Sequence, residues 1–156
     1  MYKFWKAAPW LSRLILLPPT AIFALIASRY LAHPVASAAA QGIVVPPGLG
    51  VTIARVGFGG FPLGCAIFLS TCLLSERRVI TGLTFVAIMI SVVLAVRVFG
   101  MTADSTVQEN LKLVNAEAGL LAVTGFGLIV ELSRRAHFRR VHPELQPSRI
   151  SENLRY

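Results

Sequence analysis

Five polar residues lie within or beside long apolar stretches, and their side chains are the ones that could bind a ligand or take part in catalysis. These polar-layer residues are Arg55, Arg97, Glu117, Asn115 and His33. A carboxylate in an apolar region is costly unless it is paired, and the planar guanidinium of arginine offers it two donors. The set therefore predicts a structural clamp, a pocket for a small anion or a quinone-like head group, or arginines that only face lipid.

Motifs for other chemistry are absent from the sequence. There is no H-x-x-x-H pattern, no Ser/His/Asp set, no phosphate loop and no carboxylate pair. Cys65 and Cys72 have neither a C-x-x-C spacing nor a metal-ligand spacing, and we interpret them as packing residues. His137 and His142 are spaced wrongly for two ligands on one helical face. We therefore expect no metal, no cofactor and no catalytic residues.

The composition indicates that membrane helices position the polar-layer residues. Of the 156 residues, 55% are hydrophobic and 14% are charged, against about 25% charged in a soluble domain. A soluble enzyme, a disordered chain and a disulfide scaffold are all poor fits. The net charge of +8 could indicate nucleic acid, but the basic residues lie beside apolar segments. In that position they determine topology and contact lipid headgroups, so we expect a bilayer partner and no nucleic acid.

Charged residues separate four apolar stretches, and crossing a bilayer takes roughly 20 apolar residues. The predicted helices cover residues 10–32, 50–74, 79–100 and 111–132, and residues 133–156 form a basic cytoplasmic tail. The sequence thus predicts an all-α fold, an integral membrane four-helix bundle in which residues 1–132 form one unit. We expect a multi-pass protein of the bacterial inner membrane.

The first helix has two further features. Pro18 and Pro19 should kink it, because each removes a backbone donor. Its basic start and the small residues at 36–40 are typical of a signal peptide. Arg29 and His33 interrupt that pattern, so we expect the helix to be retained.

Lysine and arginine are distributed unevenly between the two sides of this topology. Eleven lie on one side: Lys3, Lys6, Arg13, Arg77, Arg78, Arg134, Arg135, Arg139, Arg140, Arg149 and Arg155. Four lie on the other: Arg29, Arg55, Arg97 and Lys112. Because cytoplasmic loops carry the excess of basic residues, both termini should be cytoplasmic.

The spacing of two glutamates in the fourth helix predicts where Glu117 lies. The thirteen residues between Glu117 and Glu131 span only about 20 Å at ~1.5 Å per residue, less than the ~30 Å hydrocarbon core. Glu131 adjoins the arginines that mark the cytoplasmic boundary, so Glu117 should be buried below the outer surface. Counting roughly 20 residues along the other helices places Arg55 and Arg97 at a similar depth. We expect Glu117 to pair with one or both, and Asn115 and His33 are nearby candidates.

Three glycines predict a packing face on the second helix. Gly57, Gly60 and Gly64 follow one another at i, i+3 and i+7, and Gly60 and Gly64 have the small-residue spacing of membrane helix contacts. Pro62 should free the carbonyl of Phe58. Close helix contact is one interpretation, and a glycine-lined wall of a cavity is the other.

The tail carries two arginine pairs, which are Arg134, Arg135, Arg139 and Arg140. Each arginine near an anionic leaflet contributes ~1 kcal/mol, so we expect these residues to bind lipid headgroups. A specific protein partner is the alternative. The last helix should continue to about His142 and stop at Pro143.

The segment A-R-V-G-F-G-G-F-P-L-G at 54–64 resembles a bacterial family of small four-helix membrane proteins catalogued as a domain of unknown function. Arg97 matches an arginine near the end of that family's third helix, and Glu117 matches an early glutamate of its fourth. The resemblance covers about Leu14 to Glu131 and implies the four-helix fold and the polar residues, but no reaction. A distant likeness to quinone-related DoxX-like proteins carries no activity over.

Three functions follow as hypotheses. The first is an accessory or scaffolding subunit of a larger membrane complex, without catalysis of its own. The second is binding or transport of a small anionic or quinone-like ligand in the outer-leaflet polar pocket. The third, an enzyme that uses Glu117 as acid or base, is the weakest, because a carboxylate paired to arginine stays ionised and poorly basic.

Overall fold

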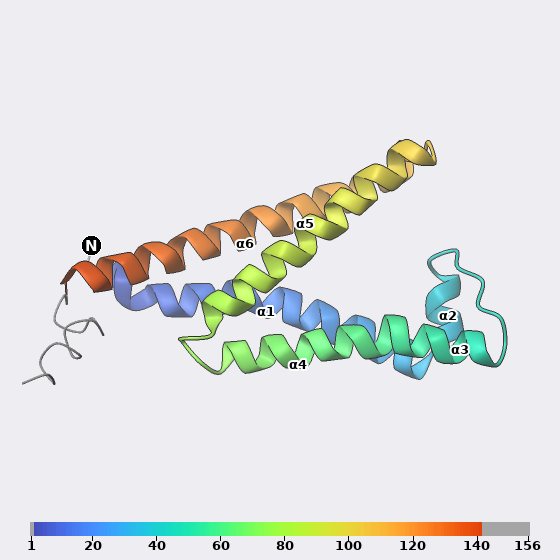
Figure 1. Cartoon of the computed structure of the whole chain (residues 1–156), viewed down its shortest axis with the longest axis horizontal. Coiled ribbons are helices and arrows are strands. Elements are labelled where there is room, and N and C mark those ends of the chain that lie inside the picture. The colour runs from blue at the N-terminus through green and yellow to red at the C-terminus, as the bar shows by residue number, and fades with distance from the viewer. Residues whose placement is uncertain (1, 142–156) are drawn as a thin grey trace, which may run out of the picture. The chain divides into compact units, whose positions relative to one another are not determined.

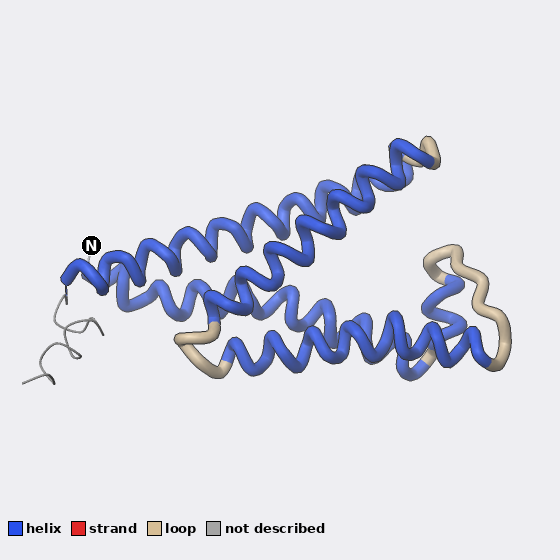
Figure 2. Tube along the Cα trace, viewed as in Figure 1, coloured by secondary structure: helices blue, strands red, loops and turns tan. Residues whose placement is uncertain are grey.

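The computed structural model describes the backbone of residues 2–141 and the side chains of residues 10–108, 110–138 and 140, and all regular structure among them is helical (Figures 1 and 2). The elements are α1 (Tyr2–Ala32), α2 (Pro34–Ala39), α3 (Leu49–Ala54), the π-helix η1 (Arg55–Gly60), α4 (Phe61–Leu73), α5 (Val79–Ala103) and α6 (Val107–Val141). Pro143, Arg149 and Arg155 lie outside the described residues, and Lys3, Lys6 and Arg139 lie outside the described side chains.

Four helical segments in the described part of the chain are long and apolar enough to cross a membrane. They are Trp10–Ala32, Leu49–Leu73, Val79–Ala103 and Asn110–Phe138. The predicted all-α fold with four long apolar helices is confirmed. The last helix is longer than its predicted apolar stretch because the basic segment continues it to Val141.

Helix α1 runs unbroken through Pro18 and Pro19. The Thr20 hydroxyl donates to the Leu16 carbonyl at 2.8 Å, so this carbonyl beside the two prolines has a second donor. The expected kink stays a prediction. The small residues that follow α1 form the short helix α2, after a break at His33.

The second crossing is made of α3, η1 and α4 in succession, and η1 is its unusual part. Its wide turn ends with the Phe61 N–H donating to the Val56 carbonyl, five residues earlier. Pro62 follows at once and is buried. Since proline has no N–H and its ring clashes with the carbonyl four residues before it, a wide turn lets the helix continue past it.

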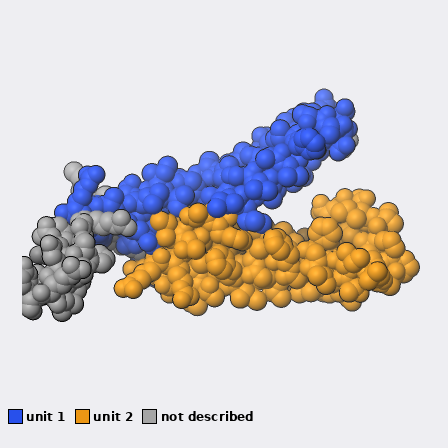
Figure 3. Space-filling model, in the orientation of Figure 1, with its two compact units in different colours: residues 1–12, 87–156 blue, residues 13–86 orange. Residues whose placement is uncertain are grey.

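By its contacts the chain forms two compact units, residues 13–86 and residues 1–12 with 87–156 (Figure 3). In the unit of residues 13–86, α1, α4 and the first turns of α5 supply the largest of the fully buried side chains. Leu16, Leu69, Cys72, Leu83 and Val86 are almost fully buried. These residues are the apolar core of this unit.

In the other unit, α5 and α6 form an antiparallel hairpin (Figure 1). Ser105 has a positive φ of 55°, and the Thr106 N–H donates to the Met101 carbonyl at 3.2 Å. This is the helix-ending arrangement that normally uses glycine at the left-handed position. The tight turn brings the last turns of α5 beside the first turns of α6.

Large apolar side chains of the four spans are widely exposed. Val96, Phe99 and Ile129 are 65%, 73% and 64% exposed. Lipid tails, which are as apolar as these side chains, can cover them. The exposed apolar side chains are therefore consistent with the four helices being membrane spans, as their composition also indicates.

Candidate functional site

Arg97 of α5 and Glu117 of α6 form a two-pronged ion pair. The Arg97 Nε donates to Glu117 Oε2 at 2.8 Å, and Nη2 donates to Oε1 at 2.6 Å. The side chains are 26% and 20% exposed. Of the two arginines expected as partners of Glu117, Arg97 is in contact with it.

Asn110 completes this arrangement. The Arg97 Nη1 donates to Asn110 Oδ1 at 3.2 Å, and the Asn110 amide donates to the Thr106 carbonyl at 3.0 Å and to its hydroxyl at 3.2 Å. We call Arg97, Glu117, Asn110 and Thr106 the hairpin clamp. It joins the two helices and the turn between them.

Sequence reasoning named Asn115 and missed Asn110. Asn110 and Glu117 are seven residues apart, which is two helical turns, so both lie on the face of α6 that meets α5. Asn115 is two residues from Glu117, points to another face and is exposed. The seven-residue spacing is the signal that would have found Asn110.

Arg55 and His33 belong to the other unit. Arg55 is the first residue of η1 and is exposed. His33 is also exposed and separates α1 from α2. Their membership of the polar layer stays a prediction.

The polar groups of the hairpin clamp bond to one another. Both carboxylate oxygens accept from Arg97, and all three guanidinium nitrogens donate. The guanidinium and the carboxylate carry opposite charges, which offset each other in this ion pair. The arrangement can hold two helices in register, and its carboxylate already occupies the two-donor edge of the guanidinium that an anion would use.

Close helix contacts are made by Gly59 and Gly82 instead of the predicted glycine face. A Cβ at Gly59 would lie 3.0 Å from Leu31 Cδ2, and one at Gly82 would lie 2.7 Å from Leu16 Cδ2 and 2.9 Å from Cys72 Cβ. A Cβ at Gly57 or Gly64 would meet nothing within 4 Å, and at Gly60 only the Arg55 carbonyl at 3.9 Å. The i, i+3, i+7 spacing assumes a regular α-helix, but the π-turn of η1 rotates the glycines that precede Pro62.

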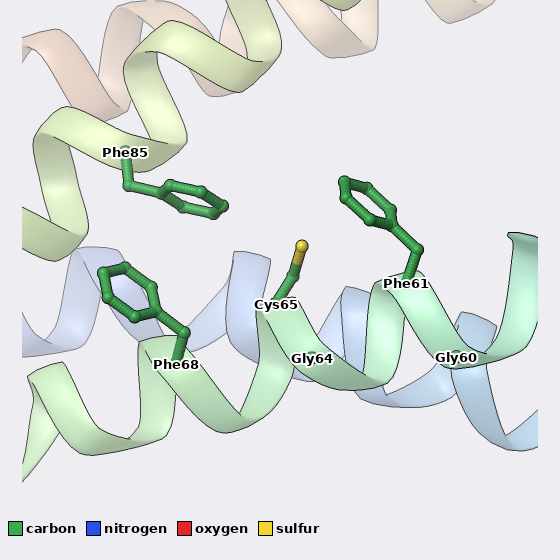
Figure 4. A pocket seen from close by; sticks show the side chains of 6 residues that line it. All are labelled: Gly60, Phe61, Gly64, Cys65, Phe68 and Phe85. Atoms are coloured by element: carbon green, nitrogen blue, oxygen red, sulfur yellow. The ribbon is translucent and has the colours of Figure 1, made fainter.

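Of the three glycines, Gly60 and Gly64 lie in the wall of a hollow, and Gly57 does not. Gly60, Phe61, Gly64, Cys65, Phe68 and Phe85 line a hollow of about 490 Å³ between α4 and α5 (Figure 4). We call it the glycine–aromatic groove. The rings of Phe68 and Phe85 are 5.0 Å apart, and the Cys65 thiol points into the groove between the aromatic side chains. None of these side chains carries a nitrogen or an oxygen.

Near the end of α6, Glu131 forms ion pairs with two arginines. Its side chain is 1% exposed and accepts from Arg134 Nε and Nη2 at 3.0 and 2.7 Å and from Arg135 Nε at 2.9 Å. Arg134 and Arg135 were expected at lipid headgroups, but both turn back to Glu131 because they follow it at i+3 and i+4. Arg140 is exposed.

Comparison of the chain with protein-family models, curated proteins and solved structures found no match. The resemblance to small four-helix membrane proteins therefore stays a prediction. The features that bear on function are the hairpin clamp, the glycine–aromatic groove and the charged end of α6.

Proposed function

We propose that this protein is an accessory or scaffolding subunit of a bacterial inner-membrane complex, with no catalysis of its own. The observation that carries the proposal is the hairpin clamp. Arg97, Glu117 and Asn110 satisfy one another, so the charged residues hold α5 against α6. The Glu117 carboxylate already occupies the two-donor edge of the Arg97 guanidinium, where an anionic ligand would otherwise bind.

The glycine–aromatic groove supplies a surface for a partner, and we propose a transmembrane helix as its occupant. Gly60 and Gly64 have the spacing that lets two membrane helices approach closely, and the space over Gly64 is open. Ligand sites usually place a few polar groups to orient their ligand. The groove lining offers glycine, phenylalanine and cysteine, which suits an apolar helix face better than an anion or a quinone head group.

The test is purification of the full chain from its native membrane in a mild detergent, followed by mass spectrometry of the intact assembly. We expect a second protein in fixed stoichiometry. Gly64→Leu should remove it, because the new side chain fills the groove. Gly57→Leu is the matched control, since Gly57 also has open space but does not line the groove.

Three outcomes would overturn part or all of this proposal. If a small apolar molecule is retained by the protein and lost in Gly64→Leu, the occupant of the groove is a ligand and not a partner helix. A dimer of this chain, lost in the same variant, would make the groove a self-association surface. A monomer without any companion, unchanged by Gly64→Leu, would contradict the scaffolding function.

A further inference from the structure

The end of α6 has two chemically different faces. Glu131, Arg134 and Arg135 form one cluster, in which the carboxylate offsets one of the two positive charges. Ser133, His137 and Arg140 follow at i, i+4 and i+7, so they share a second face. At roughly 100° per residue, this face lies on the other side of the helix from Glu131.

The second face borders a hollow of about 290 Å³, whose described lining residues are Ser133, Ala136, His137 and Arg140. A hydroxyl, an imidazole and a guanidinium can all donate hydrogen bonds to an oxyanion, and the guanidinium also brings a positive charge. The small side chain of Ala136 leaves room between them. No carboxylate is among the described lining residues, so none of them repels an anion.

The depth of this hollow also suits a phosphate. If the fourth crossing ends near Arg134, Arg140 lies six residues further, about 9 Å along the helix axis. The headgroup region extends roughly 5–7 Å beyond the hydrocarbon core on each side. His137, three residues beyond Arg134, therefore lies in the headgroup region, and Ser133 lies at its inner edge. The long side chain of Arg140 can extend back toward that region.

We propose that Ser133, His137 and Arg140 form a binding site for a phosphate group, supplied in the membrane by a phospholipid headgroup. Arg140 provides the charge, and Ser133 and His137 provide directed donors. Arg134 and Arg135 are excluded from the site because Glu131 holds them.

The test uses the side-chain NMR signals of the histidines in the full chain, labelled with ¹⁵N and held in a neutral detergent at constant pH. Short-chain phosphatidylglycerol and inorganic phosphate are titrated separately. We expect the His137 signal to shift with both, and at a lower concentration with the lipid because its chains enter the micelle. The His33 signal is the internal control and should stay in place.

Variants show whether the predicted residues bind. Arg140→Gln should weaken binding at least about fivefold, and Arg140→Lys less, because one arginine near an anionic surface has an effect of that size. Ser133→Ala should also weaken it. Lys112→Gln removes the same charge from the other end of α6 and should leave the His137 response unchanged.

Each outcome decides the proposal. A response to phosphatidylglycerol alone supports a headgroup site, and a response to inorganic phosphate alone supports a site for free phosphate. No response of His137 to either probe would overturn the site. So would equal shifts of His33 and His137, or a response that Arg140→Gln leaves intact.

Discussion

Arg97 and Glu117 meet through two parallel hydrogen bonds, although they stand twenty positions apart in the sequence. One residue lies near the end of α5 and the other near the start of α6, so their contact fixes the register of two antiparallel helices. The bidentate geometry is directional, and a shift of α6 by one residue would break both bonds. The pair therefore specifies one packing of the hairpin.

Removing one partner of this pair should be worse than removing both. Glu117→Gln leaves the guanidinium of Arg97 without its counter-charge in an apolar region, and we expect a loss of about 1–3 kcal/mol of stability. Adding Arg97→Gln should recover part of that loss. Thermal unfolding of the two single variants and the double variant in detergent measures the coupling.

Arg55→Gln is the matched control for this experiment. Both carboxylate oxygens of Glu117 accept from Arg97, so combining Arg55→Gln with Glu117→Gln should give no rescue. Purely additive effects of Arg97→Gln and Glu117→Gln would contradict the clamp.

The ion pair could be predicted from the sequence, because a buried carboxylate requires a cationic partner. Thirteen residues between two glutamates cannot span the hydrocarbon core, and a buried carboxylate needs a cation at the same depth. The choice between Arg97 and Arg55 could not be made by counting residues, because depth along the membrane does not say which helices are neighbours. Asn110 was not predicted, because the depth of a residue in the membrane does not say which face of its helix it occupies.

Gly82→Ala should destabilise the unit of residues 13–86. The new Cβ would lie 2.7 Å from Leu16 Cδ2, which can move, and 2.9 Å from Cys72 Cβ, which is fixed to the α4 backbone. One helix must shift, so we expect a loss of about 1–3 kcal/mol. Thermal unfolding in detergent measures it.

The control for this substitution is Gly125→Ala. A Cβ there meets nothing within 4 Å, so stability should be unchanged or should rise by up to about 1 kcal/mol through helix propensity. Equal effects of the two substitutions would show that Gly82 is not a close contact.

The glycines show where sequence patterns reach their limit. Helical spacing selected Gly57, Gly60 and Gly64, but a single π-turn before Pro62 changes which glycine faces α1. Proline signals that the helix is disturbed and does not say whether it bends or widens. Gly82 belongs to no glycine pattern, and only the packing of Leu16 and Cys72 makes it important.

Glu131→Gln should destabilise the protein more than Arg134→Gln or Arg135→Gln. Glu131 is almost fully buried and accepts from both arginines, so its loss leaves two cations facing each other. Loss of one arginine leaves an ion pair intact. We expect about 3–5 kcal/mol for the glutamate variant and about 1 kcal/mol for each arginine variant.

Thermal unfolding of the three variants gives the order. Hydrogen exchange of the amides near residues 131–138 should rise most in Glu131→Gln, because the cluster is local to α6. An arginine variant that is as damaging as the glutamate variant would show that the two arginines have separate roles.

The last prediction concerns topology, and both termini should be cytoplasmic. Eleven of the fifteen basic residues fall on that side. Arg13 and Glu76 lie 3.8 Å apart, so the first crossing begins at the same end of its unit as the loop before α5, in line with alternate crossings. A C-terminal reporter fusion should show cytoplasmic activity, and fusions within residues 40–48 or at the 104–106 turn should show periplasmic activity. The reverse pattern would place Glu117 near the cytoplasmic leaflet and the Ser133, His137 and Arg140 face on the outside, and the depth argument for both sites would then be wrong.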